Sequence, residues 1–506
     1  MTDQGLAISL SDSAAVAQSD EVARRIALTR QAQKLWAAKS VRERLQVVRR
    51  FRRLLADNAL TLADQANGHS RAEVLSSQVL PLADACRFLH QEGEGILAPR
   101  NPSKTSRPAW LGGVKLTIYR EPLGLILVIA PANYPVFLPG VQTLQALVAG
   151  NAVILKPGRG GQPAAQTLAK LLTKAGLDPR LFSLLPEAPE AATAALKAGV
   201  DKVVFTGSAA TGRAILQDMA PHLVPGILEL AGCDAVFIRE DADVDQAAKA
   251  LAFGLRLNAS ATCIAPRRVF VQRSITATLE VRLARLLADF PGVPVEPALA
   301  IRVCTLAREA IKGGARLLTG KLEPTTTLKP LILTDVPPAS QLLRADLFAP
   351  VLALMPFTDD DEALRLAAVC PYALGATVFG RNTKTAYALA RKVRAGLVII
   401  NDMIVPSADP RVPFGGRGES GFGVTRGAEG LLELTAVKAI VNQPNRRPRH
   451  LEPPMPGDEN LFRAYIAFAH GSNRRRFGTL RALIKALIIR IRNERTTLKG
   501  IQHAND

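Results

Sequence analysis

Between residues 125 and 230, short runs of apolar residues alternate with segments that carry apolar side chains at helical spacing. Strands buried on both faces have continuous apolar sequences, and the helices between them return the chain to the starting edge of the sheet. The alternation therefore predicts an α/β fold with a mainly parallel sheet and helices on both faces. The expected strands are 125–130, 152–155, 181–185, 202–205 and 226–230, and the expected helices are 138–149, 162–175, 190–198 and 209–219.

The flanking segments extend this pattern. Residues 21–100 carry apolar side chains three or four positions apart, as at Val41, Leu45 and Val48, and we expect them to be mainly helical. At 506 residues the chain is long enough for more than one domain. A second α/β block is expected over residues 243–427, with strands at 269–271, 351–355 and 397–400.

Cysteine usage and hydropathy narrow the class of protein. The five cysteines are odd in number and scattered, without a CxxC pair, which disfavours a disulfide framework and a cysteine zinc site. No metal is expected. No stretch approaches the ~18 uncharged apolar residues of a membrane span, and the N-terminus lacks the basic start of a signal peptide. These features favour a cytoplasmic location.

The formal net charge of +20 is concentrated near the two ends, at 24–53 and 442–506. A solvated basic surface is the simpler interpretation, and attraction to anionic lipid or nucleic acid is the alternative. Only 5% of the residues are aromatic, and they do not alternate with the basic clusters as a base-stacking surface would require. Nucleic acid is therefore not expected as a partner.

The C-terminal part has a composition of its own. Residues 442–460 contain five prolines and predict a linker, and 461–506 predict a basic amphipathic extension. One interpretation is a helix that docks on its own or a partner subunit; the other is peripheral contact of residues 474–495 with an anionic membrane, at its inner face. The apolar stripe comprises Leu480, Leu483, Ile484, Leu487, Ile488 and Ile491, beside Arg481, Lys485 and Arg492 and after Arg474–Arg476.

One turn has the character of a phosphate site. Phe205-Thr-Gly207-Ser208 joins an expected strand to an expected helix, so free backbone N–H groups and the helix N-terminus can face an anion. A plain tight turn is the alternative. Lys156, at the end of strand 152–155, is either a surface lysine or a ribose or phosphate ligand. The GxGxxG match at 416–421 has neither a strand before it nor an amphipathic helix after it, and we reject it as a dinucleotide fingerprint.

Cys263 and Glu229 are the strongest candidates for chemistry. Cys263 follows the small residues Asn258-Ala-Ser-Ala-Thr, which would let a substrate approach the sulfur closely. A buried, inert cysteine is the alternative for any single Cys. A thiol together with a separate carboxylate suggests a nucleophile and a base.

These residues occur within a series of motifs that resembles the aldehyde dehydrogenase superfamily. The similarity covers roughly residues 20–440, and eight short motifs follow in the order typical of that family. They are Pro131-Ala-Asn133-Tyr-Pro135, Leu155-Lys156-Pro157, Phe205-Thr-Gly-Ser208, Glu229-Leu-Ala-Gly232, Asn258…Cys263, Asp346-Leu-Phe-Ala-Pro350, Ile400-Asn401-Asp402 and Pro413-Phe-Gly-Gly416…Ser420-Gly-Phe-Gly423.

The resemblance implies a division into domains. A parallel-sheet cofactor domain would comprise 21–105 and 121–228, and an α/β catalytic domain 229–425. A β-arm at 106–120 and 426–441 would build homodimers or homotetramers. Residues 1–20 are expected to be a flexible N-terminus.

The resemblance also implies the chemistry. Cys263 would attack an aldehyde as thiolate, Asn133 would help to form the oxyanion hole, and Glu229 would activate the water that hydrolyses the thioester. NAD or NADP would accept the hydride. The implied cofactor-binding residues are Lys156, Arg159, Gly207, Ser208, Gly212, Leu230, Asp346 and Phe348, with Lys156 and Asp346 at the two riboses.

Several positions depart from the usual family pattern. Ser260 and Ala261 replace a common Gly-Gln, and Asp346 replaces a Glu. Arg159 replaces a Glu that accepts hydrogen bonds from the adenosine ribose. A guanidinium at this place suits a 2′-phosphate, so NADP is expected to be tolerated or preferred.

Two other functions are compatible with the same motifs. The first is a CoA-acylating enzyme, although such relatives commonly lack the base that Glu229 would supply. The second is a non-catalytic scaffold with this fold. Retention of Cys263, Glu229 and Asn133 together argues against it.

Overall fold

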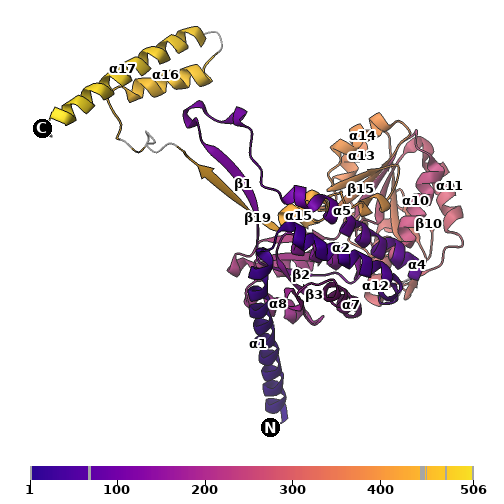
Figure 1. Ribbon diagram of the computed structural model, residues 1–506. Helices are drawn as coiled ribbons and strands as arrows, with labels where there is room; N and C mark the ends of the chain where they lie inside the picture. The colour runs from indigo at the N-terminus through magenta and orange to yellow at the C-terminus, as the bar shows by residue number, and fades with distance from the viewer. Residues whose placement is uncertain (1–2, 67–69, 445–450, 452, 473–475, 504–506) are drawn as a thin grey trace. The chain divides into compact units, whose positions relative to one another are not determined.

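The computed structural model describes residues 3–66, 70–444, 451, 453–472 and 476–503 (Figure 1). The chain forms two compact units. The first consists of residues 1–100 and 118–439, and the second of residues 101–117 and 440–506.

A six-stranded sheet occupies the first half of the larger unit. Its strand order is β18-β6-β5-β2-β3-β4, and every neighbouring pair is parallel except β18 with β6. Strand β2 is buried at every residue, as its apolar sequence predicts. The strands are β2 (Leu125–Ile129), β3 (Ala152–Lys156), β4 (Phe182–Leu184), β5 (Lys202–Gly207), β6 (Gly226–Leu230) and β18 (Gly421–Phe422).

Helices pack on this sheet through one continuous apolar core. The expected helices of the alternating region are present as α6 (Phe137–Val148), α7 (Gln162–Lys174), α8 (Pro189–Lys197) and α9 (Ala209–Met219), which confirms the predicted α/β fold. The N-terminal region supplies α1 (Asp3–Ala37), α2 (Val41–Asp57), α3 (Ala59–Asp64), α4 (Arg71–Val74), a π-helix at Leu75–Val79, and α5 (Leu80–Leu97). Residues 3–20, expected to be flexible, belong to α1; they contain no proline and several alanines, which allows a helix.

A seven-stranded sheet forms the second half of the larger unit, in the order β10-β12-β13-β8-β7-β15-β16. All neighbours are parallel except β10 with β12. Four of these strands, β7, β10, β12 and β15, were not predicted; they are only four or five residues long, and the run of β7 directly follows another strand. The strands are β7 (Asp234–Ile238), β8 (Pro266–Gln272), β10 (Arg316–Thr319), β12 (Leu331–Thr334), β13 (Val351–Phe357), β15 (Gly375–Phe379) and β16 (Leu397–Ile400).

Both faces of this sheet are covered by helices (Figure 1). Alternate side chains of β7 enter different cores: Phe237 packs in one, and Val236 and Ile238 pack in the other. Helices α12 (Pro297–Lys312), α13 (Asp360–Ala367) and α14 (Thr383–Lys392) contribute to the first core, and α10 (Val244–Arg256) and α11 (Thr276–Leu287) to the second. Smaller elements are β9 (Val293–Pro294), β11 (Thr327–Leu328), β14 (Tyr372–Ala373), β17 (Arg417–Gly418) and α15 (Gly427–Glu433).

A two-stranded sheet joins β1 (Lys115–Pro122) to β19 (Thr435–Asn442). These strands lie largely within or next to the ranges expected for the two pieces of the arm. Several of their apolar side chains are exposed, among them Leu116, Tyr119, Val437, Ile440 and Val441.

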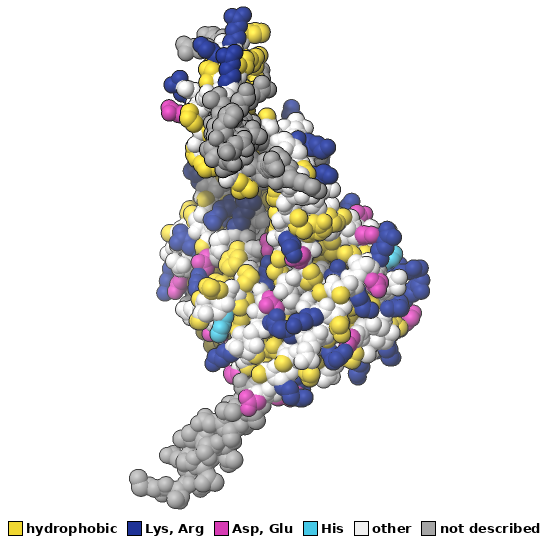
Figure 2. All heavy atoms as spheres, turned by 60° about the vertical axis from the view of Figure 1, so that its left-hand side comes forward, with side chains coloured by type: hydrophobic (Ala, Val, Ile, Leu, Met, Phe, Trp, Pro, Cys, Tyr) yellow, Lys and Arg dark blue, Asp and Glu magenta, His cyan; other side chains and the backbone are white. Residues whose placement is uncertain are grey.

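The C-terminal extension forms a helical hairpin of α16 (Asp458–His470) and α17 (Arg476–His503). A buried ion pair between Arg490 and Asp458 joins the two helices. The predicted apolar stripe lies on α17, where most of it is exposed, including Ile484, Leu487 and Ile488. Figure 2 shows apolar and basic side chains next to one another on this hairpin. The basic residues Arg474 and Arg475 and part of the predicted linker lie outside the described residues.

No described helix is long and apolar enough to cross a membrane.

Candidate active site

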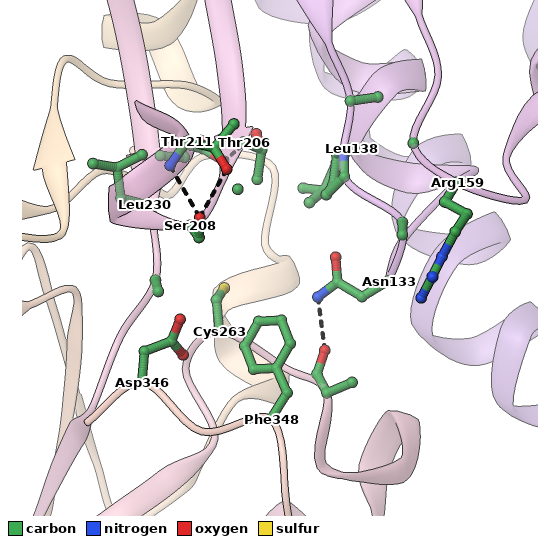
Figure 3. Close-up of a pocket in the computed structure, with 18 of the residues that line it drawn as sticks. Asn133, Leu138, Arg159, Thr206, Ser208, Thr211, Leu230, Cys263, Asp346 and Phe348 are labelled. Carbon is green, nitrogen blue, oxygen red and sulfur yellow. Dashed lines mark hydrogen bonds between the residues drawn. The ribbon is translucent and has the colours of Figure 1, made fainter. Parts of the chain in front are cut away.

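A cavity of about 630 Å³ brings together most of the residues singled out from the sequence. Cys263, Glu229 and Asn133 all line it. Figure 3 shows Asn133 and Cys263 at this cavity, although more than 120 residues separate them in the chain. Six of the eight expected cofactor residues line it too: Arg159, Gly207, Ser208, Leu230, Asp346 and Phe348. Lys156 and Gly212 are not among its lining residues.

Cys263 follows a strained turn. Asn258, Ala259 and Ser260 have φ values of 53°, 50° and 63°, in the left-handed region that non-glycine residues seldom adopt. Such strain persists only where the surrounding structure holds it, and it is common at functional sites. Here Arg267 Nη2 donates to the carbonyl of Ser260 at 2.6 Å, and Ser260 Oγ donates to the carbonyl of Ala349 at 3.1 Å.

Asn133 lies in the loop that follows β2, and its amide is fixed by the same turn. Asn133 Nδ2 donates to the carbonyl of Ala261 at 2.7 Å, and Asn258 Nδ2 donates to the carbonyl of Asn133 at 3.0 Å. A side-chain amide has two N–H donors. One is engaged by Ala261, so a second is available for an oxygen near Cys263.

Glu229 is buried in β6 beside the glycine-rich loop 413–423. Strand β18 places Gly421 directly opposite Glu229, and a side chain at Gly421 would collide with the carbonyl of Leu228. The glycine at position 421 therefore lets the backbone of this loop approach strand β6 closely. Thr425 Oγ1 donates to one carboxylate oxygen of Glu229, and Thr206 Oγ1 donates to the other at 3.4 Å.

The environment disfavours the charged forms of both groups. Burial raises the pKa of Glu229, and the charge of Arg426 and the hydroxyls of Thr425 and Thr206 oppose that rise. Burial, with the charges of Asp234 and Glu229, raises the pKa of Cys263 to about 12, and Arg426 again opposes the rise. A raised pKa suits a carboxylate that must act as a base near neutral pH, whereas the thiol needs help to ionise.

A second, smaller cavity of about 260 Å³ reaches Cys263 and Glu229 as well. It shares Leu138 and Phe414 with the larger cavity. Its remaining walls are largely apolar and include Phe137, Phe253, Leu257, Ile404 and Val405. A thiol and a carboxylate where two cavities meet can act on one bound molecule while a second occupies the other cavity.

The larger cavity fits a dinucleotide. Oδ1 of Asp346 is buried without a hydrogen-bond partner, and it faces a space where a ribose hydroxyl could donate to it. Gly158 also lines the cavity, and a side chain there would collide with the backbone of Pro131. Ser208 caps helix α9, whose N-terminus is a favourable place for a phosphate.

Lys156 and Gly212 have other surroundings. Lys156 ends β3 and is half-buried; burial lowers the pKa of its ammonium, and Glu187 and Glu190 oppose that shift. Gly212 lies in α9, and a Cβ there would come within 2.7 Å of Leu230 Cδ2. Its absent side chain lets α9 pack closely on β6. A cofactor role for these two residues stays a prediction.

Arg159 is exposed at the rim of the larger cavity, and its guanidinium forms an ion pair with Glu296 at 2.8 Å. Glu296 immediately precedes α12 and lines the same cavity. Glu296 is 137 residues from Arg159 in the chain, and no local sequence pattern indicates this pairing.

Comparisons with known proteins agree with this geometry. A sequence model described as "Aldehyde dehydrogenase family" matches residues 10–440. The chain is 31% identical to a 4,4'-diapolycopene aldehyde oxidase of Methylomonas, over 88% of this chain and 86% of that protein. It is 30% identical to a Mycobacterium ulcerans protein provisionally named succinate-semialdehyde dehydrogenase (NADP+) 2, over 87% of each. The solved structure of an NAD-dependent aldehyde dehydrogenase from Sinorhizobium meliloti superimposes with a TM-score of 0.77, at 27% identity, over 87% of this chain and 88% of that one.

The chain belongs to the aldehyde dehydrogenase family. The expected family and fold class are confirmed. As an NAD(P)-dependent aldehyde dehydrogenase, this enzyme oxidises an aldehyde to a carboxylic acid. 

The structure adds site residues that the sequence analysis missed. Thr206 and Thr425 hydrogen-bond to Glu229, and Arg426 lines the smaller cavity. Thr425 and Arg426 follow the end of the glycine-rich motif by two and three positions, and this proximity was the only sequence feature that could have indicated a role at the site. The hydrogen bond from Thr425 to Glu229 joins residues 196 positions apart in the sequence and could not be inferred from spacing.

Proposed function

We propose that this aldehyde dehydrogenase acts through a thioester at Cys263. The Cys263 sulfur attacks the aldehyde carbon, and the resulting oxyanion accepts hydrogen bonds from the Asn133 amide and the Cys263 backbone N–H. The bound nicotinamide supplies the hydride acceptor for this oxidation. Glu229 then takes a proton from the water that attacks the thioester, and the acid and the free thiol are released.

The observation that carries this proposal is the position of Cys263 and Glu229 at the junction of two cavities. The larger one suits the dinucleotide, with Ser208 and the α9 N-terminus at a phosphate and Asp346 at a ribose. The smaller one suits the aldehyde. Because its walls are largely apolar, an aldehyde with an apolar body is the favoured substrate class. The buried carboxylate of Glu229 favours hydrolysis over transfer of the acyl group to CoA.

A single-turnover experiment tests this mechanism. Glu229→Gln should form the thioester, release one reduced cofactor per site in a burst, and then stall, because no base activates water. Mass spectrometry of the stalled enzyme should find the acyl group on Cys263. Cys263→Ala, the control, should give neither burst nor adduct while remaining folded. Unchanged steady-state turnover of Glu229→Gln would point to another base.

For the cofactor we propose that NADP is used at least as well as NAD. Arg159 lines the cavity where the usual family Glu would accept from the adenosine ribose, and a guanidinium can instead pair with a 2′-phosphate. The ion pair with Glu296 holds the guanidinium at the cavity but must be displaced or shared when the phosphate binds.

We also propose a homodimer or homotetramer assembled through β1 and β19. A two-stranded sheet is only marginally stable alone, and this one exposes apolar side chains such as Val437 and Val441. Burial against a second copy would remove them from water. The molar mass measured by light scattering tests this, and a monomer at micromolar concentration would contradict it.

The hairpin of α16 and α17 supports a peripheral contact with anionic lipid. It exposes apolar Phe462, Ile466 and Ile488 together with basic Arg463 and Lys485. This would place the enzyme at the inner face of a membrane in a reducing compartment, where its five cysteines stay free. The full chain should sediment with anionic vesicles more than a 1–445 truncation does, and equal binding would contradict the contact.

A further inference from the structure

Arg426 is a buried cation in the wall of the smaller cavity, which it shares with Cys263 and Glu229. Only 5% of its surface is exposed. Burying a charge is costly unless the protein pairs it or uses it. Neither the family motifs nor the thioester mechanism assigns this arginine a role.

The guanidinium is held without a salt bridge. Nη1 donates to the carbonyl of Ser407 at 2.6 Å, and the guanidinium carbon lies 4.2 Å from the ring centre of Phe414 and 5.6 Å from that of Phe137. Nε is buried without a hydrogen-bond partner, and no described carboxylate lies within ion-pair distance. Aromatic faces fix the position of a cation without neutralising it.

The backbone of Arg426 is also unfavourable. Its φ of 59° lies in the left-handed region, and its backbone N–H is bound by Gln145 Oε1 at 3.1 Å. A glycine would adopt this conformation without strain. The fold therefore maintains both strain and a buried charge at this position, and stability alone does not account for either.

The charge faces the two groups on which the proposed chemistry depends. Arg426 is the cation that opposes the rise in pKa at both Glu229 and Cys263. Besides burial, the negative charge of Asp234 raises the pKa of Cys263. Tyr134, whose hydroxyl is hydrogen-bonded to Thr262, is close enough to Cys263 and Glu73 for their charges to add to the rise that burial causes in its own pKa. At Cys263 the positive charge of Arg426 therefore opposes the negative charges of Asp234 and Glu229.

We propose that Arg426 is a positioning residue whose fixed positive charge partly offsets the cost of burying charge on Glu229 and on the Cys263 thiolate. This inference rests on the proposed roles of Cys263 and Glu229. Phe414 and Thr425 form a β-bridge, and Thr425 hydrogen-bonds to Glu229. The next residue, Arg426, stacks on Phe414. One short segment thus supplies both a hydrogen bond and a charge to the site.

The test measures thiolate formation directly and without turnover. The free enzyme is treated with iodoacetamide over a range of pH, and the alkylation rate of the Cys263 peptide is followed by mass spectrometry. Because the pKa of Cys263 is about 12, the rates are compared on the rising limb of the profile, below its midpoint. Arg426→Met should shift this limb to higher pH by about one unit or more, the range expected for loss of a nearby opposite charge. At pH below the midpoint the rate should then fall about tenfold or more.

Arg426→Lys keeps the charge and should retain most of the wild-type profile, and Arg426→Gln replaces the Met variant if that does not fold. Arg44→Met is a matched control, because Arg44 is also buried with unpartnered nitrogens but lines neither cavity. It should leave the profile unmoved. An unshifted profile in folded Arg426→Met, or in folded Arg426→Gln where that replaces it, would overturn the inference.

The acid limb of kcat should shift upward in the same variant, since Glu229 would need a higher pH to ionise. Failure of the proposed mechanism is distinguishable from failure of this inference. If Cys263→Ala kept its activity, the thioester mechanism would be lost, whereas the alkylation profile would still report whether Arg426 controls the Cys263 thiol.

Discussion

Replacing Glu296 by Gln should tighten NADP binding and leave NAD binding nearly unchanged. In the free enzyme Glu296 holds Arg159 in an ion pair at 2.8 Å, with 67% and 83% of the two side chains exposed. The 2′-phosphate of NADP carries close to two negative charges and would have to compete with Glu296 for the same guanidinium. NAD lacks the 2′-phosphate and would not compete with Glu296 for Arg159.

The structure sets the size of the effect. Exposed ion pairs contribute about 0.2–1 kcal/mol, so abolishing the competition should lower the Kd for NADP by about 1.4- to 5-fold. A larger effect would need a buried pair, which the exposure of both side chains rules out. Because surface charges are screened, the gain should shrink as salt rises.

Titration calorimetry with NADP and NAD, at low and at moderate salt, measures both constants. Asp178→Asn is a matched control, because Asp178 is a partly exposed carboxylate paired with Arg180, away from the cavity. Arg159→Glu should act in the opposite direction and shift kcat/KM toward NAD. If Glu296→Gln leaves the ratio of the two Kd values unchanged and Arg159→Glu does not move kcat/KM, Arg159 does not face the 2′-phosphate.

Three further outcomes are expected. Asn133→Ala should lower kcat by roughly 10²–10³, as loss of one oxyanion donor does; an effect confined to KM in steady-state assays would refute that role. Thr425→Val removes a hydrogen bond that lowers the pKa of Glu229, so the pH below which kcat declines should rise, and an unmoved acid limb would contradict the assignment. Ala259→Gly relieves a residue at φ 50° and should stabilise the fold by about 0.5–1 kcal/mol after the entropy cost of glycine; a lower thermal midpoint would show that the turn is not strained.

Much of the architecture was predictable because local sequence controls it. The apolar run at 125–130 became the fully buried strand β2, and the expected helix 209–219 has the bounds of α9. A buried parallel strand appears in the sequence as a continuous apolar run, and an amphipathic helix as apolar residues at helical spacing. Both patterns lie within a single segment. The motifs around Cys263 and Glu229 were likewise sufficient to indicate the family.

The working environment of the site was decided by tertiary structure. Three contacts exist only because folding brings distant residues together. Thr425 hydrogen-bonds to Glu229, Arg426 stacks on Phe414 beside Cys263, and Glu296 forms an ion pair with Arg159. Lys156 and Gly212 were expected at the cofactor site from the family resemblance, but neither lines the cavity. Residue types and their order are properties of the sequence, whereas burial, charge pairing and access depend on which distant segments meet, because electrostatic and packing energies act through space and not along the chain.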